Sequence, residues 1–506
     1  MRQTRNIQRA AIAATIGLAV SFAPPALAAT GTNSEALRAA VSADNIINHL
    51  EALQAIADDN GGNRAADSPG YEDSLAHIED TLRDAGYDPV RQPFTYDRYN
   101  FESASLERVT PDPETYVHGE AFLDMTYSGA GDVTAPLAAV DINLSGDHAS
   151  TSGCEAADFA GFTAGDIALI QRGTCSFRVK ADNAAAAGAA GVIIFNQGDV
   201  VPGDDRVGLF GGTLDLPQAA IPVVSTSYTT GAELAGLTGV EMHLAVAADV
   251  AQISSFNILA DTAGRADRTV VVGAHLDSVA EGPGINDNGS GSAAILETAV
   301  QMKELGIEPG NRVRFAFWGG EEDGLIGSEY YVSQLTPREL KDHAVNLNFD
   351  MVGSPNFVRY VYDGDGSAFG QKGPNGSAVV EQVFLDYFTS QGLPVAPTAF
   401  DGRSDYFGFI NNGIPAGGLF TGAEGLKTAE EAAVFGGTAG EPLDPCYHAA
   451  CDTIDNLDAG VLEEMADAIA HATLTFATTT SAVNGTAKGK AAGQADLKFK
   501  ANKLLK

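Results

Sequence analysis

Hydrophobic positions at helical spacing open the folded part of the chain. Apolar residues recur every three or four positions from Ile46 to Ile56 and again from Leu75 to Leu82, which predicts two amphipathic helices. The Gly86-Tyr87 pair ends the second helix, and a strand is expected near Pro93–Tyr99. The folded part of the chain is therefore predicted to begin with two helices followed by a strand.

The pattern changes between residues 108 and 251. Short strand-like runs such as Ile167–Gln171, Gly191–Phe195 and Ile221–Ser225 alternate with turns rich in Gly, Pro and Asp. An Ala-rich helix is expected at Lys180–Ala189. Because no His–carboxylate motif with metal spacing occurs here, this segment is predicted to be a separate, non-catalytic domain.

From about residue 252, apolar strands alternate with helices. This alternation predicts an α/β fold, with a mixed, largely parallel central sheet flanked by helices. The strands are expected at Val270–Gly273, Val313–Phe317, Ala344–Phe349 and Gly417–Phe420, and the helices at Ser292–Leu305, Ser328–Leu335, Ala378–Gln391 and Ala459–Ala477.

The two ends of the chain have their own composition. Basic residues precede an apolar run of about 14 residues, and Ala26-Leu27-Ala28 gives a small-x-small cleavage site. The run is short of the roughly 20 residues that span a bilayer, so residues 1–28 are predicted to be a signal peptide rather than an anchor. We expect a protein secreted outside the cell or into the periplasm. Residues 481–506 carry six lysines and one aspartate and are expected to form a basic flexible tail.

Charge restricts the partners. The 506 residues include 66 acidic and 30 basic ones, a net charge of −36. A nucleic-acid partner is excluded, because phosphates need a basic surface, and stable association with an anionic membrane is disfavoured. Cationic ligands, such as the N-terminal ammonium of a peptide, would be attracted.

Four cysteines allow three pairings. In an exported protein, two local disulfides are the economical choice: Cys154–Cys175 and Cys446–Cys451. A zinc site made of cysteines is the weaker alternative, because no C-x-x-C occurs.

Chemically active residues follow the predicted strands. Sites in open α/β sheets form outside the carboxyl ends of the strands. Zinc takes imidazole and carboxylate ligands, and hydrolytic two-metal sites hold ions about 3.5–4 Å apart. A carboxylate that bridges two His/carboxylate pairs would build such a site, and Asp277 could accept the second ring N–H of the first histidine. The five residues that would suffice are His275, Asp287, Glu322, Asp350 and His448.

Taken singly, these residues have ordinary explanations. A His-x-Asp is common, a Glu-Glu pair is usually solvated, and Asp350 could cap a helix. The Gly-rich loop 282–291 lacks the lysine of a phosphate-binding loop. Neither H-E-x-x-H nor G-x-S-x-G occurs, which argues against a single-zinc helix motif and a serine hydrolase. The order of all the pieces at strand ends favours the metal site.

Several motifs together resemble a known family. They are GAHLDS, GINDNGSGSAA, WGGEEDGLIGS, LNFDMVGSPN, GRSDY, GGLFTGA and CYHAACDT, with DNGGNRA at Asp59–Ala65. This set is similar to the secreted bacterial zinc aminopeptidases of metallopeptidase family twenty-eight. The resemblance implies a discontinuous peptidase domain at 34–107 plus 252–480. GDIALIQRGTCSF and GVIIFN resemble a protease-associated (PA) domain, inserted at 108–251 as a passive spacer or as a part that shapes access or binds a partner.

The resemblance also implies roles. His275 and Asp350 would bind one zinc ion, Glu322 and His448 a second, and Asp287 both. Glu321 would be the general base, and Tyr447 would stabilise the oxyanion. Arg403 would lie in the substrate site, and Met351 and Phe420 would line a pocket for large apolar N-terminal residues such as Leu. The Cys446–Cys451 disulfide would hold Tyr447 and His448.

Further implications concern ligands and partners. The substrates would be peptides or proteins with a free N-terminus, and a monomer is expected. Some members bind calcium near the chain termini, but Ala40-Val41 stands here where an acidic residue would be needed, so calcium stays open.

Other functions remain as alternatives. A dizinc carboxypeptidase or dipeptidase can share this scaffold, and Arg403 would then meet the substrate carboxylate. A single-zinc cyclising acyltransferase of related fold is disfavoured by the full ligand set. A binding protein without catalysis is disfavoured because no ligand is missing.

Overall fold

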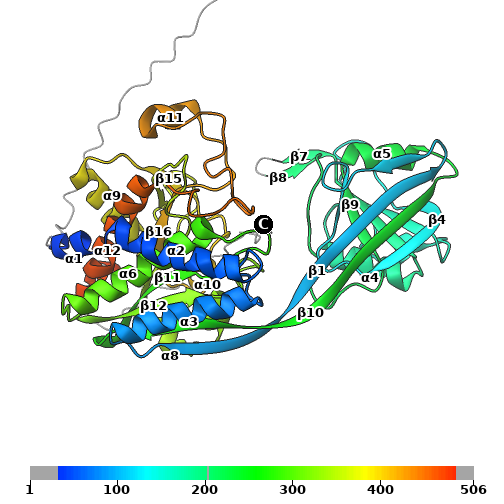
Figure 1. The fold of residues 1–506 in the computed structure, drawn as a ribbon. Helices are drawn as coiled ribbons and strands as arrows, with labels where there is room; N and C mark the ends of the chain where they lie inside the picture. Colours follow the sequence, from blue (N-terminus) through cyan, green and yellow to red (C-terminus); the bar gives the residue numbers. More distant parts are fainter. Residues whose placement is uncertain (1–31, 202–203, 486–506) are drawn as a thin grey trace, which may run out of the picture.

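Two lobes joined by a two-stranded ribbon make up the molecule (Figure 1). The computed structural model describes residues 32–201 and 204–485. The predicted signal peptide and most of the predicted tail lie outside the described residues. The larger lobe is called the main lobe here, and the smaller one the insert lobe. Within the described ranges, no helix has both the length and the hydropathy needed to cross a bilayer.

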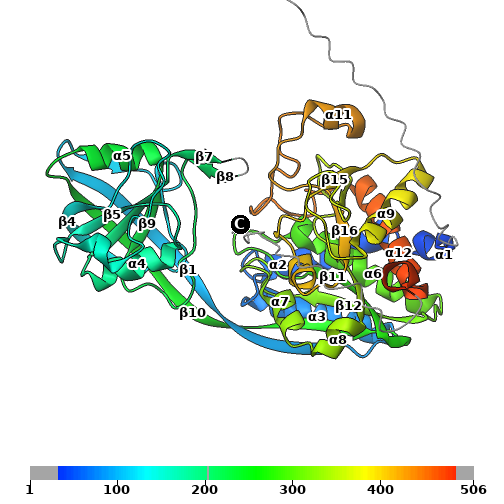
Figure 2. The ribbon, with the colours of Figure 1, turned by 180° about the vertical axis from the view of Figure 1, so that it is seen from behind.

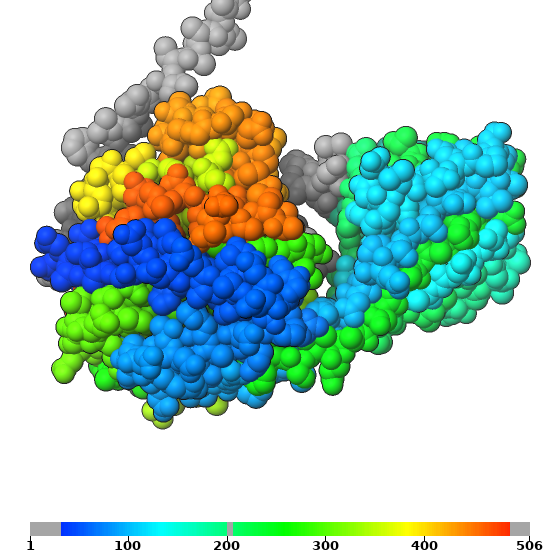
Figure 3. Space-filling model, in the orientation of Figure 1, coloured from blue at the N-terminus to red at the C-terminus, as the bar shows by residue number. Residues whose placement is uncertain are grey.

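Three helices, α1 (Glu35–Ala40), α2 (Ala43–Asp59) and α3 (Pro69–Asp84), begin the main lobe. The helical spacing predicted the last two of these correctly. Ser42 and Ser68 cap them, because each hydroxyl accepts a backbone N–H from the first turn. Their apolar faces are buried in a core that they share with other helices and with the central sheet, and the helices spread over one side of the lobe (Figure 3).

The centre of the main lobe is a mixed sheet, as predicted. Strand β11 (Arg265–His275) lies between β12 (Asn311–Trp318) and β13 (His343–Phe349), and β13 pairs with β16 (Ala416–Phe420), all in parallel. On the far edge, β14 (Tyr360–Tyr362) runs antiparallel to β16 and parallel to β15 (Ala396–Thr398). The parallel strands carry the site, because their carboxyl ends meet at one edge.

Both faces of this sheet are covered. Val270 and Val272 point to a core shared with α2, α3, α6, α9 and α12, whereas Val271 points to a second core with α7 and α10. Figure 2 shows the molecule from behind, where α7 and α8 are visible. The helices are α6 (Gly291–Glu304), α7 (Ile326–Ser333), α8 (Pro337–Asp342), α9 (Ser377–Gln391), α10 (Tyr406–Asn411), α11 (Ala429–Phe435), α12 (Ala459–Thr478) and α13 (Ser481–Asn484).

The start of the predicted flexible tail is ordered. Ser481–Asn484 forms α13, and Asn484 Nδ2 donates to the Ala344 carbonyl over 3.0 Å. The expectation of a flexible segment from residue 481 was therefore wrong for its first residues. The low apolar content that suggested flexibility does not reveal such a backbone contact.

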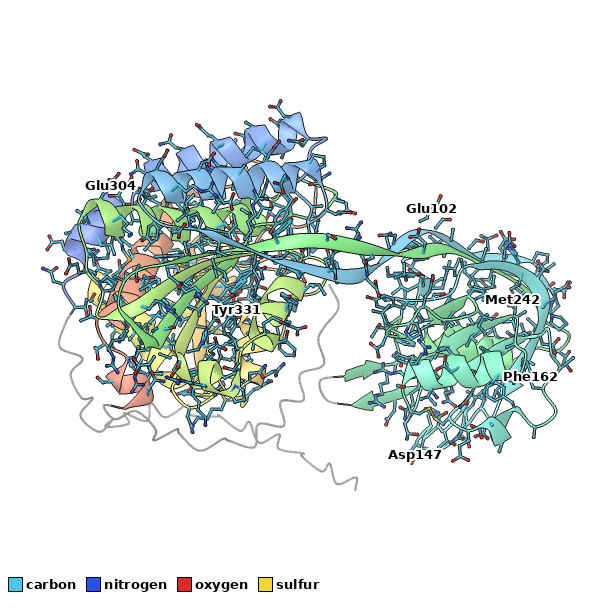
Figure 4. The ribbon with its side chains drawn as sticks, turned by 90° about the horizontal axis from the view of Figure 1, so that it is seen from below. Glu102, Asp147, Phe162, Met242, Glu304 and Tyr331 are labelled. Carbon is cyan, nitrogen blue, oxygen red and sulfur yellow. A yellow bond between two sulfur atoms is a disulfide. The ribbon has the colours of Figure 1, made fainter. Side chains whose placement is uncertain are left out.

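Strands β1 (Val90–Thr110) and β10 (Glu241–Asp261) form the connecting ribbon. They pair antiparallel from Val90↔Leu259 to Thr110↔Glu241. The expected strand Pro93–Tyr99 is only the first part of β1. The expected domain limits near 107 and 252 therefore fall inside continuous strands. Figure 4 shows Glu102 on the exposed ribbon and Met242 inside the insert lobe.

The insert lobe has its own sheet and cores. Its strands β4 (Gly131–Val140), β5 (Ile167–Gln171), β6 (Gly191–Phe195) and β9 (Val223–Thr226) are parallel neighbours, with β3 (Phe122–Asp124) antiparallel at the edge. The remaining elements are β2 (Glu114–Tyr116), η1 (Ala156–Phe159), α4 (Phe177–Ala186), β7 (Asp199–Val201), β8 (Asp204–Arg206) and α5 (Tyr228–Gly236).

The helix expected at Lys180–Ala189 begins earlier, at Phe177, because the Ser176 hydroxyl caps it. Cys154–Cys175 and Cys446–Cys451 are disulfides, as predicted.

One lysine of the insert lobe is completely buried. Lys180 Nζ donates to the carbonyl oxygen of Gln171 over 3.0 Å and to that of Ser152. Burial lowers the pKa of this amine to about 8. Two hydrogen bonds compensate for this burial and join α4 to the last residue of β5 and to the loop around Cys154.

We expect Lys180→Met to lower the free energy of unfolding by about 2 kcal/mol, because two buried carbonyl groups lose their donor. The folded-state pKa lies below the ordinary value of 10.5, so wild-type stability should rise, relative to the variant, as the pH increases from about 8 to about 10.5. Urea unfolding at pH 7 and pH 10 measures both effects. Lys341→Met on exposed α8 is the control, and equal changes in both variants would contradict the expectation.

Candidate metal centre

Loops from three neighbouring parallel strands bring the predicted ligands together. His275 is the last residue of β11, Glu321 and Glu322 follow β12, and Asp350 follows β13. Asp287 lies in the irregular turn η2 (Ile285–Ser290) that leads into α6.

His448 reaches the same place from the short loop closed by the Cys446–Cys451 disulfide. Residues that are far apart in the sequence therefore lie in one cluster, as expected for side chains that follow parallel strands.

Asp287 stands between the two histidines. Its Oδ1 lies 3.2 Å from His275 Nε2, and its Oδ2 lies 3.3 Å from His448 Nε2. Each histidine also faces a second carboxylate. Asp350 Oδ1 is 3.3 Å from His275 Nε2, and Glu322 Oε2 is 3.1 Å from His448 Nε2. The cluster thus consists of two His/carboxylate pairs that share one aspartate.

The electrostatics of this cluster suit a cation. Burial would lower the pKa of His275, but Glu321 and Asp350 raise it well above its ordinary value. Burial also works against protonation of His448, yet Asp287 and Glu322 raise its pKa to about 10. The cluster contains more carboxylates than imidazoles. A bound cation would therefore balance its negative charge. Imidazole nitrogen and carboxylate oxygen are the donors that zinc takes, so the residues present fit zinc.

The second nitrogen of His275 has a different partner from the expected one. Nδ1 lies 3.0 Å from the main-chain carbonyl of Asp277 and 3.8 Å from its carboxylate. The prediction that the Asp277 carboxylate accepts this N–H was wrong, because the carboxylate is turned toward the next loop. There it accepts the backbone N–H groups of Glu321 at 3.2 Å and Glu322 at 3.3 Å. Asp277 therefore positions two carboxylates rather than the imidazole.

Arg64 supports the cluster from outside it. Its side chain is fully buried and donates to the carbonyls of Pro283 at 2.9 Å and Gly284 at 2.6 Å, and to that of Leu276. Burial lowers its pKa to about 10. The guanidinium thereby ties the loop after His275 to the loop before Asp287. The DNGGNRA motif was the only sequence signal for it.

Two more residues support the cluster, and the sequence alone did not indicate their roles. Asp452 accepts the backbone N–H groups of Asn286 at 2.9 Å and Asp287 at 3.0 Å. Ser404 donates its hydroxyl to the second oxygen of Asp350. Since such contacts fix ligand orientation, these residues position the cluster.

A cleft beside the cluster contains the expected substrate residues. Met351, Phe420, Arg403 and Tyr447 all line it, together with Asp287 and Asp350. The Tyr447 ring stacks on the His448 ring, with 3.8 Å between the ring centroids. The predicted substrate-binding residues therefore lie beside two of the predicted metal ligands.

Near Ala40 and Val41, where the resemblance would place calcium, two carboxylates already have hydrogen-bond donors. Helix α12 offers two carboxylates toward the N-terminal helices. Glu463 accepts the N–H of Ala43, and Asp467 accepts from Arg38 Nη1 at 3.1 Å. A guanidinium already supplies the positive charge there.

Comparisons with known proteins agree with this geometry. The model of "Peptidase family M28" matches residues 257–473, and that of the PA domain matches 133–234. The "Aminopeptidase" of Pseudomonas aeruginosa PAO1 is 49% identical over 447 residues, which cover 88% of this chain and 82% of that protein. The "Probable lipoprotein aminopeptidase LpqL" of Mycobacterium tuberculosis is 42% identical over 460 residues, 89% of this chain and 88% of that protein.

Solved structures give the same fold. The aminopeptidase from Aneurinibacillus sp. strain AM-1 matches with a TM-score of 0.65 and 28% identity, over 87% of this chain and 95% of that one. A zinc aminopeptidase from Bacillus subtilis matches with a TM-score of 0.57 and 27% identity, over 85% and 94%.

We expect Arg64→Met to weaken zinc binding about tenfold or more, because the loops that carry His275 and Asp287 lose their common donor. Competition with a zinc chelator measures this affinity. The control is Arg83→Met, a half-exposed arginine on α3. Unchanged affinity in a folded Arg64→Met protein would show that the backbone alone holds the two loops.

Proposed function

This chain belongs to peptidase family M28 and is a zinc-dependent aminopeptidase, and we propose that two zinc ions in the cluster serve the removal of single N-terminal residues. The observation that carries the proposal is Asp287, whose two oxygens face two different histidines. His275 and Asp350 would hold one ion, and Glu322 and His448 the other. Asp287 would bind both.

Zinc would supply Lewis-acid polarisation of the scissile carbonyl and a water of lowered pKa. Glu321 would take the proton of the attacking water and return it to the leaving amine. Its side chain is fully buried, and its backbone is held by Asp277. Glu321 Oε2 lies 3.8 Å from His275 Nε2, farther than the carboxylates of Asp287 and Asp350. This offset supports a base beside the ligands rather than another ligand.

Tyr447 would stabilise the oxyanion. Its phenol oxygen accepts from Arg403 Nη2 over 3.2 Å. The hydroxyl would donate its proton to the developing negative charge during the reaction. Arg403 is held in turn by Glu424, at 2.8 and 3.3 Å.

The same contacts bear on the carboxypeptidase alternative. Because Glu424 already pairs with Arg403 on two nitrogens, this guanidinium is poorly placed to receive a substrate carboxylate as well. The carboxylates of the cluster suit an N-terminal ammonium instead. The aminopeptidase function is therefore favoured over the carboxypeptidase and dipeptidase alternatives.

The remaining features complete the proposal. Met351 and Phe420 line the cleft and would favour large apolar N-terminal residues such as Leu. The enzyme would be secreted after signal-peptide cleavage and act as a monomer on peptides and proteins. The peptidase domain would comprise 34–107 and 252–480, and the PA domain at 108–251 would shape access or bind a partner.

The test pairs two substrates with one chelator. Mature protein is assayed on leucine p-nitroanilide and its N-acetyl form, with and without 1,10-phenanthroline, and zinc is then restored. Hydrolysis of only the unblocked substrate, lost on chelation and regained with zinc, is expected. If protein that holds two zinc ions cleaves neither, the proposal fails and peptides with free carboxyl termini become the next substrates.

Two substitutions test the role of Glu321 as the base and the role of His448 as a metal ligand. Glu321→Gln should lose at least a hundredfold in kcat and keep two zinc ions per chain, because the amide cannot take a proton. His448→Ala should lose one ion, because only Glu322 and the shared Asp287 remain there. Metal analysis of dialysed protein with kcat measurements checks both. Near wild-type turnover in Glu321→Gln would refute its role as base, and two ions in His448→Ala would refute the ligand assignment.

A further inference from the structure

We propose that Asp401 extends the cleft's specificity to a basic N-terminal residue, lysine above all. The inference rests on the proposed function, because the cleft receives an N-terminal side chain only in an aminopeptidase. It goes beyond the expected preference for apolar residues. Asp401 would be a specificity-determining residue that meets the side-chain ammonium of the substrate.

The cleft has two chemically different parts. Met351, Ala399 and Phe420 give it apolar walls, and Asp401 adds a carboxylate to the same lining. Met351 is only 2% exposed, so its side chain is packed into this wall. A lysine side chain has the same division, since an apolar stem of four carbons ends in an ammonium group. Leucine would use only the walls, whereas lysine would use the walls and the carboxylate.

Asp401 is held in one orientation. Its Oδ1 accepts the backbone N–H of Arg403 over 3.1 Å and the hydroxyl of Tyr406 over 2.9 Å. The Tyr406 ring is completely buried, so this anchor is rigid. In the described part of the chain, no donor binds Oδ2. An exposed carboxylate with one oxygen anchored and one available is suited to a cation that arrives with the substrate.

The neighbouring arginine does not neutralise this carboxylate. The Arg403 guanidinium donates to Glu424 at 2.8 and 3.3 Å and to Tyr447 at 3.2 Å. Only its backbone N–H reaches Asp401. Tyr362 also lines the cleft, and burial, Asp350 and Asp401 raise the pKa of its phenol well above the ordinary value, so this group stays neutral.

A general attraction for cations must be separated from a specific contact. The chain carries a net charge of −36, which would draw any basic substrate toward it. This long-range effect changes little when one charge of 36 is removed. A direct contact with Asp401 would respond strongly to the loss of that charge alone.

The experiment compares three p-nitroanilides, of lysine, norleucine and leucine, on wild-type enzyme and two variants. Norleucine has the four-carbon stem of lysine without the ammonium. Asp401→Asn keeps an oxygen that can accept from Arg403 and Tyr406 but removes the charge. Glu430→Gln removes one exposed charge on α11, outside the residues that line the cleft. We measure kcat/KM for each pair at low and at physiological salt.

We expect Asp401→Asn to lower kcat/KM for lysine about tenfold and that for norleucine and leucine less than twofold. Glu430→Gln should change none of the three by more than twofold. An equal loss for all three substrates in Asp401→Asn would overturn the inference and assign Asp401 to the α-ammonium. No change for lysine would also overturn it. If the wild type cleaves none of the three, the proposed function itself fails; if it cleaves them and the variant does not discriminate, only this inference fails.

Discussion

Mutual repulsion among buried carboxylates is the constraint on which the main lobe depends. Asp287, Asp350, Glu321 and Glu322 meet at one edge of the sheet with two imidazoles. The four residues are therefore held from outside the cluster. The Ser404 hydroxyl binds the Asp350 carboxylate, whereas the backbone N–H groups of the other three residues are bound by Asp277 and Asp452. The free energy of folding of the lobe offsets the repulsion within this cluster, whose negative charge only a bound cation can balance well.

This constraint explains why so much support is backbone-based. Asp277 binds two N–H groups of the glutamate loop, Asp452 binds two N–H groups of the Asp287 turn, and Arg64 binds three carbonyls. Peptide groups supply direction without net charge, so they fix the ligands at lower electrostatic cost.

The sequence predicted the centre of the molecule better than its connections. His275, Glu322 and Asp350 follow buried strands whose apolar runs are easy to recognise, and parallel strands bring their ends together. The length of β1 was missed because many of its residues are half-exposed on the ribbon, so no clear alternation extends beyond Tyr99.

Arg64 and the true partner of His275 could not be predicted for another reason. Both depend on which carbonyl a side chain meets, and carbonyl groups leave no mark in a sequence. The Arg403–Glu424 pair could not be predicted either, because its members are 21 residues apart and only the fold brings their side chains together.

The ribbon has an evolutionary consequence. Tyr99 and Val250 are direct partners across β1 and β10, and everything between them lies on the far side of that pair. Removing this stretch would leave two adjacent strand ends that a tight turn could join. The register of the remaining strands would be unchanged. The insert lobe is thus a cassette, which descendants of an ancestral gene can gain, lose or exchange without rebuilding the sheet that carries the catalytic loops.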